Sequence, residues 1–158
     1  KMERVNKILN HPTYKTLLEE LSSLEKDRFF CKHSLEHFLD VARIAYINVL
    51  ERGLSYKKEI IYAIALLHDI GRVEEYKNGT DHNIASVKIA EEILTELEFS
   101  KEEIDMICKC IKEHRIESQD ELSKIIYQSD KSSRNCFNCE AFDFCKWPKD
   151  RKNTGIKN

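Results

Sequence analysis

Hydrophobic residues along this chain recur at steps of three and four positions, the period at which one face of an α-helix meets a core. The pattern predicts helices over residues 35–51, 56–70 and 83–98, over one or two short stretches of 2–27 that break near Pro12, and after Ser100 and Ser118. No stretch shows the alternation of apolar and polar positions that a half-buried strand requires. We therefore expect an all-α fold, a bundle of about six to seven helices with a short irregular tail.

The ends of the expected helices carry recognisable capping residues. Gly53 can end the helix over 35–51, and Ser55 can cap the helix that follows. A Ser and a Glu three positions apart predict capping boxes at Ser100–Glu103 and Ser118–Glu121. Residues 72–82 are polar and are expected to be irregular.

Length and composition agree with a single domain over residues 1–158. The chain has 158 residues with only four Gly and two Pro, so helix breakers are few. The formal net charge of −2, with Lys and Arg spread along the chain, argues against general nucleic-acid binding. No apolar run approaches the roughly 20 residues of a membrane span, and no signal peptide is visible. We expect a cytoplasmic protein whose six Cys are thiols or metal ligands rather than disulfides.

Several titratable residues occupy positions on the predicted apolar stripes. His68, His114 and Asp130 each continue the stripe of their own helix, and His37 lies one turn before Val41. A buried imidazole or carboxylate is unfavourable unless it is paired or bound to a metal. Each of them alone fits an ordinary hydrogen-bonded core residue, but four on separate helices favour a shared divalent cation. Imidazole and carboxylate ligands suit manganese, iron, zinc or nickel.

The dipeptide of His68 and Asp69 is the sharpest local feature of the sequence. Adjacent helical residues project about 100° apart. At a helix end the two side chains can therefore grip one metal ion, or the Asp can bridge two. His-Asp dipeptides also arise by chance, so this pair alone carries little weight.

These residues resemble the HD superfamily of metal-dependent phosphohydrolases. The match consists of His37, then His68 and Asp69 in the local sequence H-D-I-G, then Asp130, in the order of the four defining ligands. The similarity covers about residues 30–135, which we take as the core of a single HD domain. The combined pattern is specific for the superfamily and unspecific for the substrate.

The resemblance implies a metal site with six ligands. His82 with the segment after it, and His114 at the end of its helix, resemble further histidines of many bacterial members. One ion would be held by His37, His68, Asp69 and Asp130, and a second by Asp69, His82 and His114. Iron, manganese or nickel would be the metal. The set looks most like the branch that includes the symmetrical diadenosine tetraphosphatases, and mixed di-iron oxygenases of the superfamily use a comparable set.

The activity implied by the resemblance is hydrolysis of a phosphoester or phosphoanhydride in a nucleotide or another small phosphorylated metabolite, through a metal-bound hydroxide. Asp69 would accept a hydrogen bond from that hydroxide. Arg72 and Lys131 can bind the phosphate, although an ordinary solvated base explains each equally well; Arg115 and Arg134 are weaker candidates. A di-iron oxygenase and a non-catalytic nucleotide-binding regulatory module are the alternatives, and the intact ligand set argues against the module.

A cysteine cluster of the form C-x2-C-x5-C lies in the tail, residues 136–158, at Cys136, Cys139 and Cys145. Structural zinc takes four ligands, commonly with Cys pairs two residues apart, so a fourth must come from elsewhere. Cys31 is our choice. It lies six residues before His37, and Cys136 lies six residues after Asp130, so the two segments would start close together if His37 and Asp130 share a metal. His33 is the next choice. Four thiolates can also hold an iron–sulfur cluster, and partly buried reduced thiols are the alternative.

The remaining cysteines and the tail aromatics are expected to serve packing. Cys108 and Cys110 lie inside a predicted helix. Phe137, Phe142, Phe144 and Trp147 are expected to form a small apolar lid that docks the tail, although they could also line a base-binding pocket. The expected anchors of the tail are therefore a metal site and an aromatic cluster.

Overall fold

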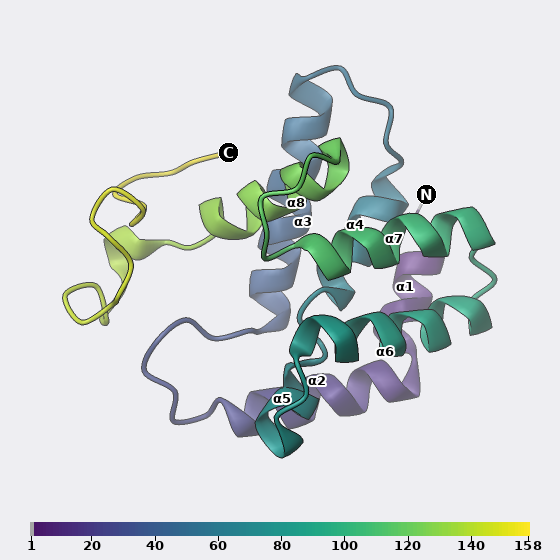
Figure 1. The fold of residues 1–158 in the computed structure, drawn as a ribbon, viewed down its shortest axis with the longest axis horizontal. Coiled ribbons are helices and arrows are strands. Elements are labelled where there is room, and N and C mark those ends of the chain that lie inside the picture. Colours follow the sequence, from purple (N-terminus) through teal and green to yellow (C-terminus); the bar gives the residue numbers. More distant parts are fainter. Residues whose placement is uncertain (1) are drawn as a thin grey trace.

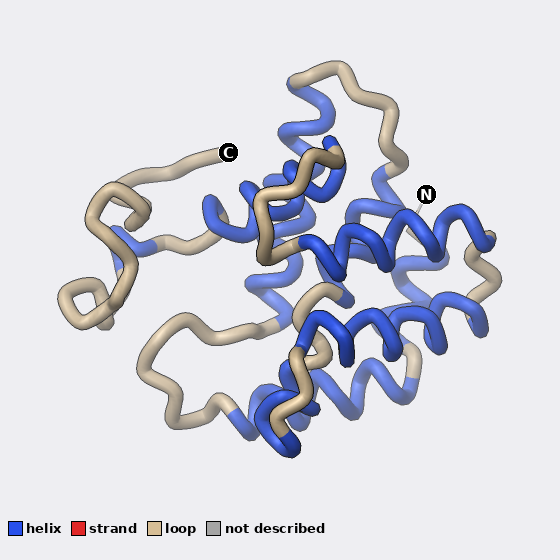
Figure 2. The backbone as a smooth tube through the Cα atoms, viewed as in Figure 1, coloured by secondary structure: helices blue, strands red, loops and turns tan. Residues whose placement is uncertain are grey.

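The computed structural model describes residues 2–158, and over that range it contains eight α-helices, one short 3-10 helix and no strand (Figure 1, Figure 2). The helices are α1 (Glu3–Asn10), α2 (Pro12–Leu24), α3 (Leu35–Glu51), α4 (Lys58–Leu67), α5 (Arg72–Asn78), α6 (His82–Glu96), α7 (Lys101–Glu113), α8 (Glu121–Ser132) and η1 (Cys136–Asn138). The predicted all-α fold is confirmed. None of the helices between residues 2 and 158 has both the length and the apolar character of a membrane span.

Helix α4 is buried on nearly every side. Seven of its ten residues are buried, so its apolar surface is not confined to one stripe. Helices α1, α3, α6 and α7 pack against it, and α8 packs against α3 and α7. Figure 1 shows α6 and α7 side by side in front of it. The C-terminal end of α4, where His68 follows, is therefore an interior position.

The capping of α7 agrees with the prediction, and the capping of α8 corrects it. The side chains and amides of Ser100 and Glu103 exchange hydrogen bonds, so the capping box of α7 is confirmed. The predicted box of α8 is wrong, because Asp120 rather than Ser118 caps the helix by accepting from the Ser123 amide. Ser118 accepts from the Asp120 amide instead. Asp120 directly precedes the first helical residue, where its carboxylate can reach the free amides.

Two other predictions about helix boundaries are also wrong. Lys57 is the N-cap of α4 and makes no side-chain cap hydrogen bond, so Ser55 lies outside the helix. Residues 72–82 were predicted to be irregular, yet they contain α5, which ends at Gly79 in the left-handed conformation with φ of 78°. This helix has only about two turns, and Val73 is its single buried residue, so no repeated apolar position marks it in the sequence; tertiary packing of Val73 against the core holds it.

Gly71, between α4 and α5, lies in direct contact with α6. Its amide donates to Ser86 Oγ at 2.8 Å. A Cβ added at Gly71 would lie 2.4 Å from the Ser86 nitrogen and 2.5 Å from the His82 carbonyl oxygen. Only glycine allows this approach, which sets the distance between His68–Asp69 and the beginning of α6.

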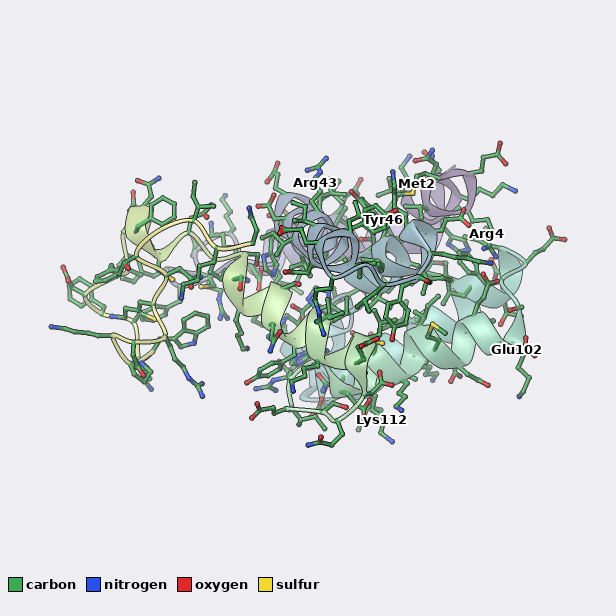
Figure 3. The ribbon with its side chains drawn as sticks, turned by 90° about the horizontal axis from the view of Figure 1, so that it is seen from above. Met2, Arg4, Arg43, Tyr46, Glu102 and Lys112 are labelled. Carbon is green, nitrogen blue, oxygen red and sulfur yellow. The ribbon has the colours of Figure 1, made fainter. Side chains whose placement is uncertain are left out.

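Arg4 fastens α1 to the bundle. Its guanidinium lies 2.9 Å from Glu59 of α4, 2.8 Å from Glu103 of α7 and over the ring of Phe99. Figure 3 shows Arg4 at the end of the molecule opposite the tail. This contact joins three helices that are distant in sequence.

The tail after α8 lies to one side of the helices (Figure 1, Figure 3). Asn153 anchors it by donating a hydrogen bond to the Lys131 carbonyl at 2.8 Å. Phe144 contacts the ring of Phe29, with centroids 5.9 Å apart, but it is 70% exposed, and Phe137 is 49% exposed. The predicted apolar lid is therefore wrong for these two residues, because the tail offers too little apolar surface to bury them.

Replacing Gly71 by alanine is expected to destabilise the fold. The added Cβ would overlap backbone atoms of α6, and relief of such overlap typically costs about 1–3 kcal/mol. Urea unfolding followed by circular dichroism measures the change in the free energy of unfolding. Gly155→Ala is the matched control, since nothing lies within 4 Å of its added Cβ. Equal stability of the two variants would contradict the close approach of α6.

Candidate metal centre

The structure brings all six residues of the predicted metal site together. Asp69 belongs to two groups of side chains whose ligand atoms lie within 4.8 Å of one another. The first group is His37, His68, Asp69 and Asp130, and the second is Asp69, His82 and His114. These residues come from α3, the α4–α5 turn, α6, the end of α7 and α8. Asp69 therefore lies at the centre of the site.

The first group faces one oxygen of Asp69. His68 directly follows α4, and its Nε2 lies 3.2 Å from Asp69 Oδ2 and 3.7 Å from Asp130 Oδ1. His37, in the first turn of α3, places its Nε2 3.1 Å from Asp130 Oδ1. His37, His68 and Asp69 are buried, whereas the Asp130 side chain remains 14% exposed. The group is thus enclosed except at Asp130.

The second group faces the other oxygen of Asp69. His82 is the first residue of α6 and His114 follows the last residue of α7; their Nε2 atoms lie 3.4 Å and 3.3 Å from Asp69 Oδ1. Because His68 approaches Oδ2, a single carboxylate presents one oxygen to each group. This arrangement allows a carboxylate to bridge two metal ions.

The imidazoles around Asp69 are held at their outer nitrogens. His68 and His114 each donate from Nδ1 to the carbonyl three residues earlier, both at 2.6 Å. His82 Nδ1 lies 2.9 Å from Glu75 Oε2. Carbonyl and carboxylate oxygens only accept, so each Nδ1 carries a proton, and a neutral ring then presents the lone pair of Nε2 to the centre. Hydrogen bonds of this kind orient metal-binding histidines.

The buried atoms without a hydrogen-bond partner in the part of the chain that the structure describes include three possible metal-ligand atoms: His68 Nε2, Asp69 Oδ1 and His82 Nε2. Unpaired buried polar atoms are unfavourable and call for a binding partner. A divalent cation accepts electron pairs from all three, and a mixed imidazole and carboxylate set suits first-row transition metals. The His/Asp clusters therefore fit a divalent metal site.

The electrostatics of the two groups also favour a cation. Burial acts to raise the pKa values of Asp69 and Asp130, but facing imidazoles, chiefly His68 for Asp69 and His37 for Asp130, hold both well below the usual range. Burial lowers the pKa values of His37 and His82, which favours the neutral form that ligates metal. Burial acts in the same direction at His68, but the carboxylates of Asp69 and Asp130 outweigh it and raise the pKa of His68 to about 10, so a metal ion would replace a proton there. Two ionised carboxylates in a nearly dry interior attract positive charge.

His33 faces the same centre, although the sequence analysis considered it only as a reserve ligand of the cysteine site. Its Nδ1 lies 2.6 Å from Glu25 Oε2, and its Nε2 lies 3.9 Å from Asp69 Oδ2. Glu25 also accepts from the Tyr76 hydroxyl at 2.7 Å. Both members of the His33–Glu25 pair are buried. His33 precedes α3, so no apolar stripe marks it as inward-facing.

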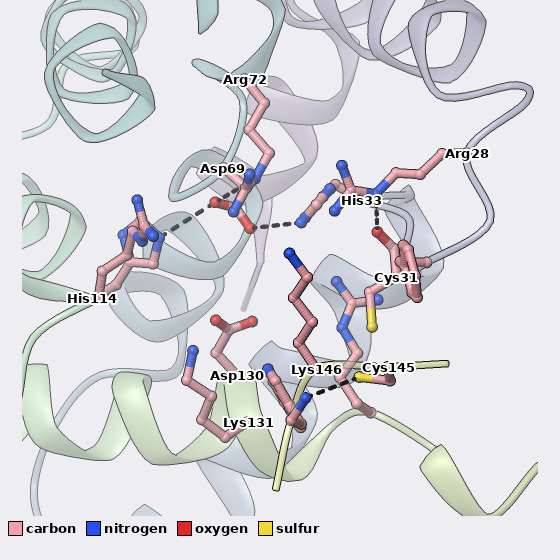
Figure 4. A pocket seen from close by; sticks show the side chains of 14 residues that line it. Arg28, Cys31, His33, Asp69, Arg72, His114, Asp130, Lys131, Cys145 and Lys146 are labelled. Carbon is pink, nitrogen blue, oxygen red and sulfur yellow. Dashed lines mark hydrogen bonds and ion pairs between the residues drawn. The ribbon is translucent and has the colours of Figure 1, made fainter. Parts of the chain in front are cut away.

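A pocket of about 410 Å³ opens onto Asp69 and Asp130 (Figure 4). Its lining includes six basic residues: Arg28, Arg72, Arg115, Lys131, Arg134 and Lys146. Four of these were candidates from the sequence. Arg28 and Lys146 were not, because the loop and the tail that carry them have no periodic pattern. The pocket is suited to an anionic ligand.

Two cysteines of the predicted second site, Cys31 and Cys145, line the same pocket where the tail meets the segment before α3. Burial raises the pKa of Cys31, Arg134 opposes the rise, and the three tail thiols, led by Cys139, add to it. Among residues 2–158, however, the groups with ligand atoms within 4.8 Å of one another contain no cysteine. The thiolate metal site stays a prediction. Cys108 and Cys110 are buried in α7.

These features define a class of protein, an all-α domain whose interior His and Asp residues fit a divalent metal site. The family model of the HD domain matches residues 34–135. The chain therefore belongs to the HD domain family. This membership agrees with the resemblance inferred from the motifs.

Two comparisons place the chain among its relatives. It is 46% identical over 155 residues to an uncharacterized protein of Clostridium beijerinckii, and the alignment covers 98% of this chain and 99% of that protein. Its fold is similar to the crystal structure of a predicted HD superfamily hydrolase from an uncultured Thermotogales bacterium. That match has a TM-score of 0.64 at 20% identity and covers 94% of this chain and 86% of that one.

The His33–Glu25 pair predicts a specific dependence of stability on pH. Burial acts to raise the pKa of Glu25, but the hydrogen bonds and charge of His33 outweigh it and lower the pKa to about 2. An unfolded glutamate titrates near about 4.3, so the stabilisation is complete above that pH and is lost as the pH falls through about 2. Urea unfolding of wild type and Glu25→Gln at a series of pH values from 6 down to about 2 measures how much of this stabilisation is lost.

The difference in stability between wild type and Glu25→Gln should be fully present above about pH 4.3, the ordinary pKa of a glutamate, and should shrink as the pH falls toward about 2. Glu19→Gln, at an exposed position of α2, is the control and should stay close to wild type at each pH. A difference between wild type and Glu25→Gln that does not change with pH would contradict the stabilisation of ionised Glu25 by His33.

Proposed function

We propose that this protein is a metal-dependent phosphohydrolase that cleaves a phosphoester or phosphoanhydride of a nucleotide or another small phosphorylated metabolite. One observation carries the proposal: the Asp69 carboxylate presents one oxygen to each of two His-containing groups at the floor of a basic pocket. Membership of the HD domain family supports it. The hydrolase described for the similar Thermotogales structure is consistent with it.

The proposed ligands are the six residues of the two groups. His37, His68, Asp69 and Asp130 would hold one ion, and Asp69, His82 and His114 a second, with iron, manganese or nickel as the metal. When bound, such metals supply a water of lowered pKa and stabilise negative charge on phosphoryl oxygens. Asp69 is placed to accept a hydrogen bond from the attacking water, because both of its oxygens face the interior of the site.

Arg72 and Lys131 are the proposed phosphate-binding residues. The Nε of Arg72 lies 3.1 Å from Asp69 Oδ1, so its guanidinium already stands at the rim of the centre. Its planar fork can bind two phosphate oxygens at once. Lys131 follows Asp130 and lines the pocket, where its ammonium makes no ion pair with residues 2–158 and lies 5.8 Å from the centre of the Trp147 ring. Both bases can thus orient a phosphate toward Asp69.

The Asp69→Ala variant is expected to lose hydrolysis and most of its bound metal while keeping nearly all of its helicity. The reason is that removal of Asp69 takes one ligand from each group. Phosphate release from nucleotides under manganese, iron and nickel, elemental analysis and circular dichroism measure the three properties. Asp105→Ala, at an exposed position of α7, should match wild type. Full turnover by purified Asp69→Ala would show that the assignment is wrong.

The same assay separates hydrolysis from the oxidative chemistry of a di-iron oxygenase. A hydrolase releases phosphate without oxygen, whereas an oxygenase requires iron and consumes oxygen. Phosphate release that continues under anaerobic conditions supports the proposal. Substrate turnover that stops without oxygen would overturn it.

We also propose a thiolate metal site that joins the tail to the segment before α3. Cys31, Cys136, Cys139 and Cys145 would be its ligands, for zinc or an iron–sulfur cluster. Its support is the position of Cys31 and Cys145 in the lining of one pocket and the amide of Trp147, which donates to Cys145 Sγ at 3.5 Å. Backbone amides that donate to sulfur favour the thiolate form. The tail buries few apolar residues, so a metal would supply its missing anchor.

Cobalt loading tests the thiolate site independently of activity. The wild-type protein should show a thiolate-to-cobalt charge-transfer band, and Cys139→Ser should weaken it strongly because one of four sulfur ligands is lost. Cys108→Ser, in α7, is the control and should keep the band. A brown protein as isolated would indicate an iron–sulfur cluster. No thiolate band, with neither zinc nor iron bound by the tail thiols, would contradict the site.

A further inference from the structure

The outer wall of the pocket is built by the tail. Lys146 and Trp147 line the same pocket as Asp69 and Asp130, although they follow the HD domain in the chain. Figure 4 shows the side chain of Lys146 reaching from the tail into the pocket, on the side that faces Asp69. The pocket therefore lies between the predicted metal centre and a segment outside the matched domain.

The basic residues that line the pocket differ in the hydrogen bonds that they already make within the protein. Arg28 donates to the Cys31 carbonyl and to the Tyr76 hydroxyl, and Arg134 donates to the Lys32 carbonyl. Lys146, by contrast, makes no hydrogen bond or ion pair within the described range 2–158 and is exposed. An ammonium group that points into a basic pocket without a protein partner is available to an anion.

The size of the pocket matters because one phosphate at the centre would leave much of it unfilled. Its volume of about 410 Å³ lies within the range of small-molecule sites, about 300–1,000 Å³. Arg72 lies beside Asp69 and Lys131 follows Asp130, whereas Lys146 enters the same pocket from the tail. The positive charges of the pocket are thus supplied by several segments, and one phosphate cannot use all of them.

We propose that Lys146 is a substrate-binding residue that takes a second phosphate group of a substrate with a chain of phosphates. This inference rests on the proposed function, which places the first phosphate at the Asp69 centre. Trp147, the next residue, also lines the pocket and would lie near the bound chain. The selectivity of the protein for polyphosphate chains over a single phosphate then depends on the tail, and Lys146 is a specificity-determining residue.

Binding of inorganic tripolyphosphate and of orthophosphate tests this inference without requiring turnover. Isothermal titration calorimetry on wild type should show tripolyphosphate binding at least about tenfold more tightly than orthophosphate. Lys146→Ala should remove most of this advantage and leave orthophosphate binding nearly unchanged. Lys149→Ala is the matched control, because Lys149 is an exposed tail lysine that does not line the pocket. Tripolyphosphate can also remove metal from the protein, and because it would do so equally in Lys149→Ala, the comparison with this control corrects for that effect.

The single tryptophan of the chain supplies a second measurement. Trp147 is the only Trp, so its fluorescence reports directly on the tail wall. Tripolyphosphate should change its emission, and orthophosphate should not. Equal affinities for the two ligands in wild type, equal losses in Lys146→Ala and Lys149→Ala, or an unchanged Trp147 emission would each overturn the inference.

The outcomes separate this inference from the proposed function. Tripolyphosphate binding that depends on Lys146, in a protein that hydrolyses no phosphate compound, would leave the tail assignment standing and reject the phosphohydrolase. Hydrolysis that needs Asp69 but does not depend on Lys146, with equal binding of tripolyphosphate and orthophosphate, would reject the tail assignment and leave the phosphohydrolase standing. Circular dichroism of Lys146→Ala should match wild type, since the side chain is exposed.

Discussion

Asp69 is buried with four imidazoles around it, and an ionised carboxylate in such a place is stable only where positive charge or hydrogen-bond donors face it. The facing groups come from segments that are far apart in the sequence, so they meet only when the bundle is folded. A cation bound there would therefore stabilise the folded state as well as supply chemistry. Stability and function are coupled at this one side chain.

The ends of helices explain how the imidazoles are aimed. His68 and His114 each stand at the C-terminal end of a helix, α4 and α7, where the last carbonyls have no amide partner within the helix. Each imidazole uses one of those carbonyls as the acceptor for its Nδ1, which turns Nε2 inward. Helix termination thus satisfies the backbone and orients the ligand in one contact. His82 begins α6 instead and relies on Glu75 of α5.

The parts of this molecule that follow a regular period could be predicted from the sequence, and the parts fixed by tertiary contacts could not. The range 35–51 was predicted as a helix because its apolar residues recur over several turns, and α3 spans the same residues. Helix α5 was missed because it has only about two turns and a single buried residue, Val73, which forms no repeated pattern. The polar residues on the apolar stripes pointed to the centre, but His33 and Lys146 lie in irregular segments, where inward direction depends on packing alone.

The boundary of the HD domain divides the pocket into two kinds of surface. The residues that surround Asp69 lie inside the matched range 34–135, apart from His33 just before it, whereas Lys146 and Trp147 lie beyond it. A rigid, buried centre constrains substitution at every ligand, because each side chain is packed and hydrogen-bonded. The tail has few buried residues and is held by polar contacts such as that of Asn153, so its sequence can change without disturbing the core. Under the proposed function, selection among phosphorylated ligands would therefore be altered most readily at the tail wall, while the site around Asp69 stays the same.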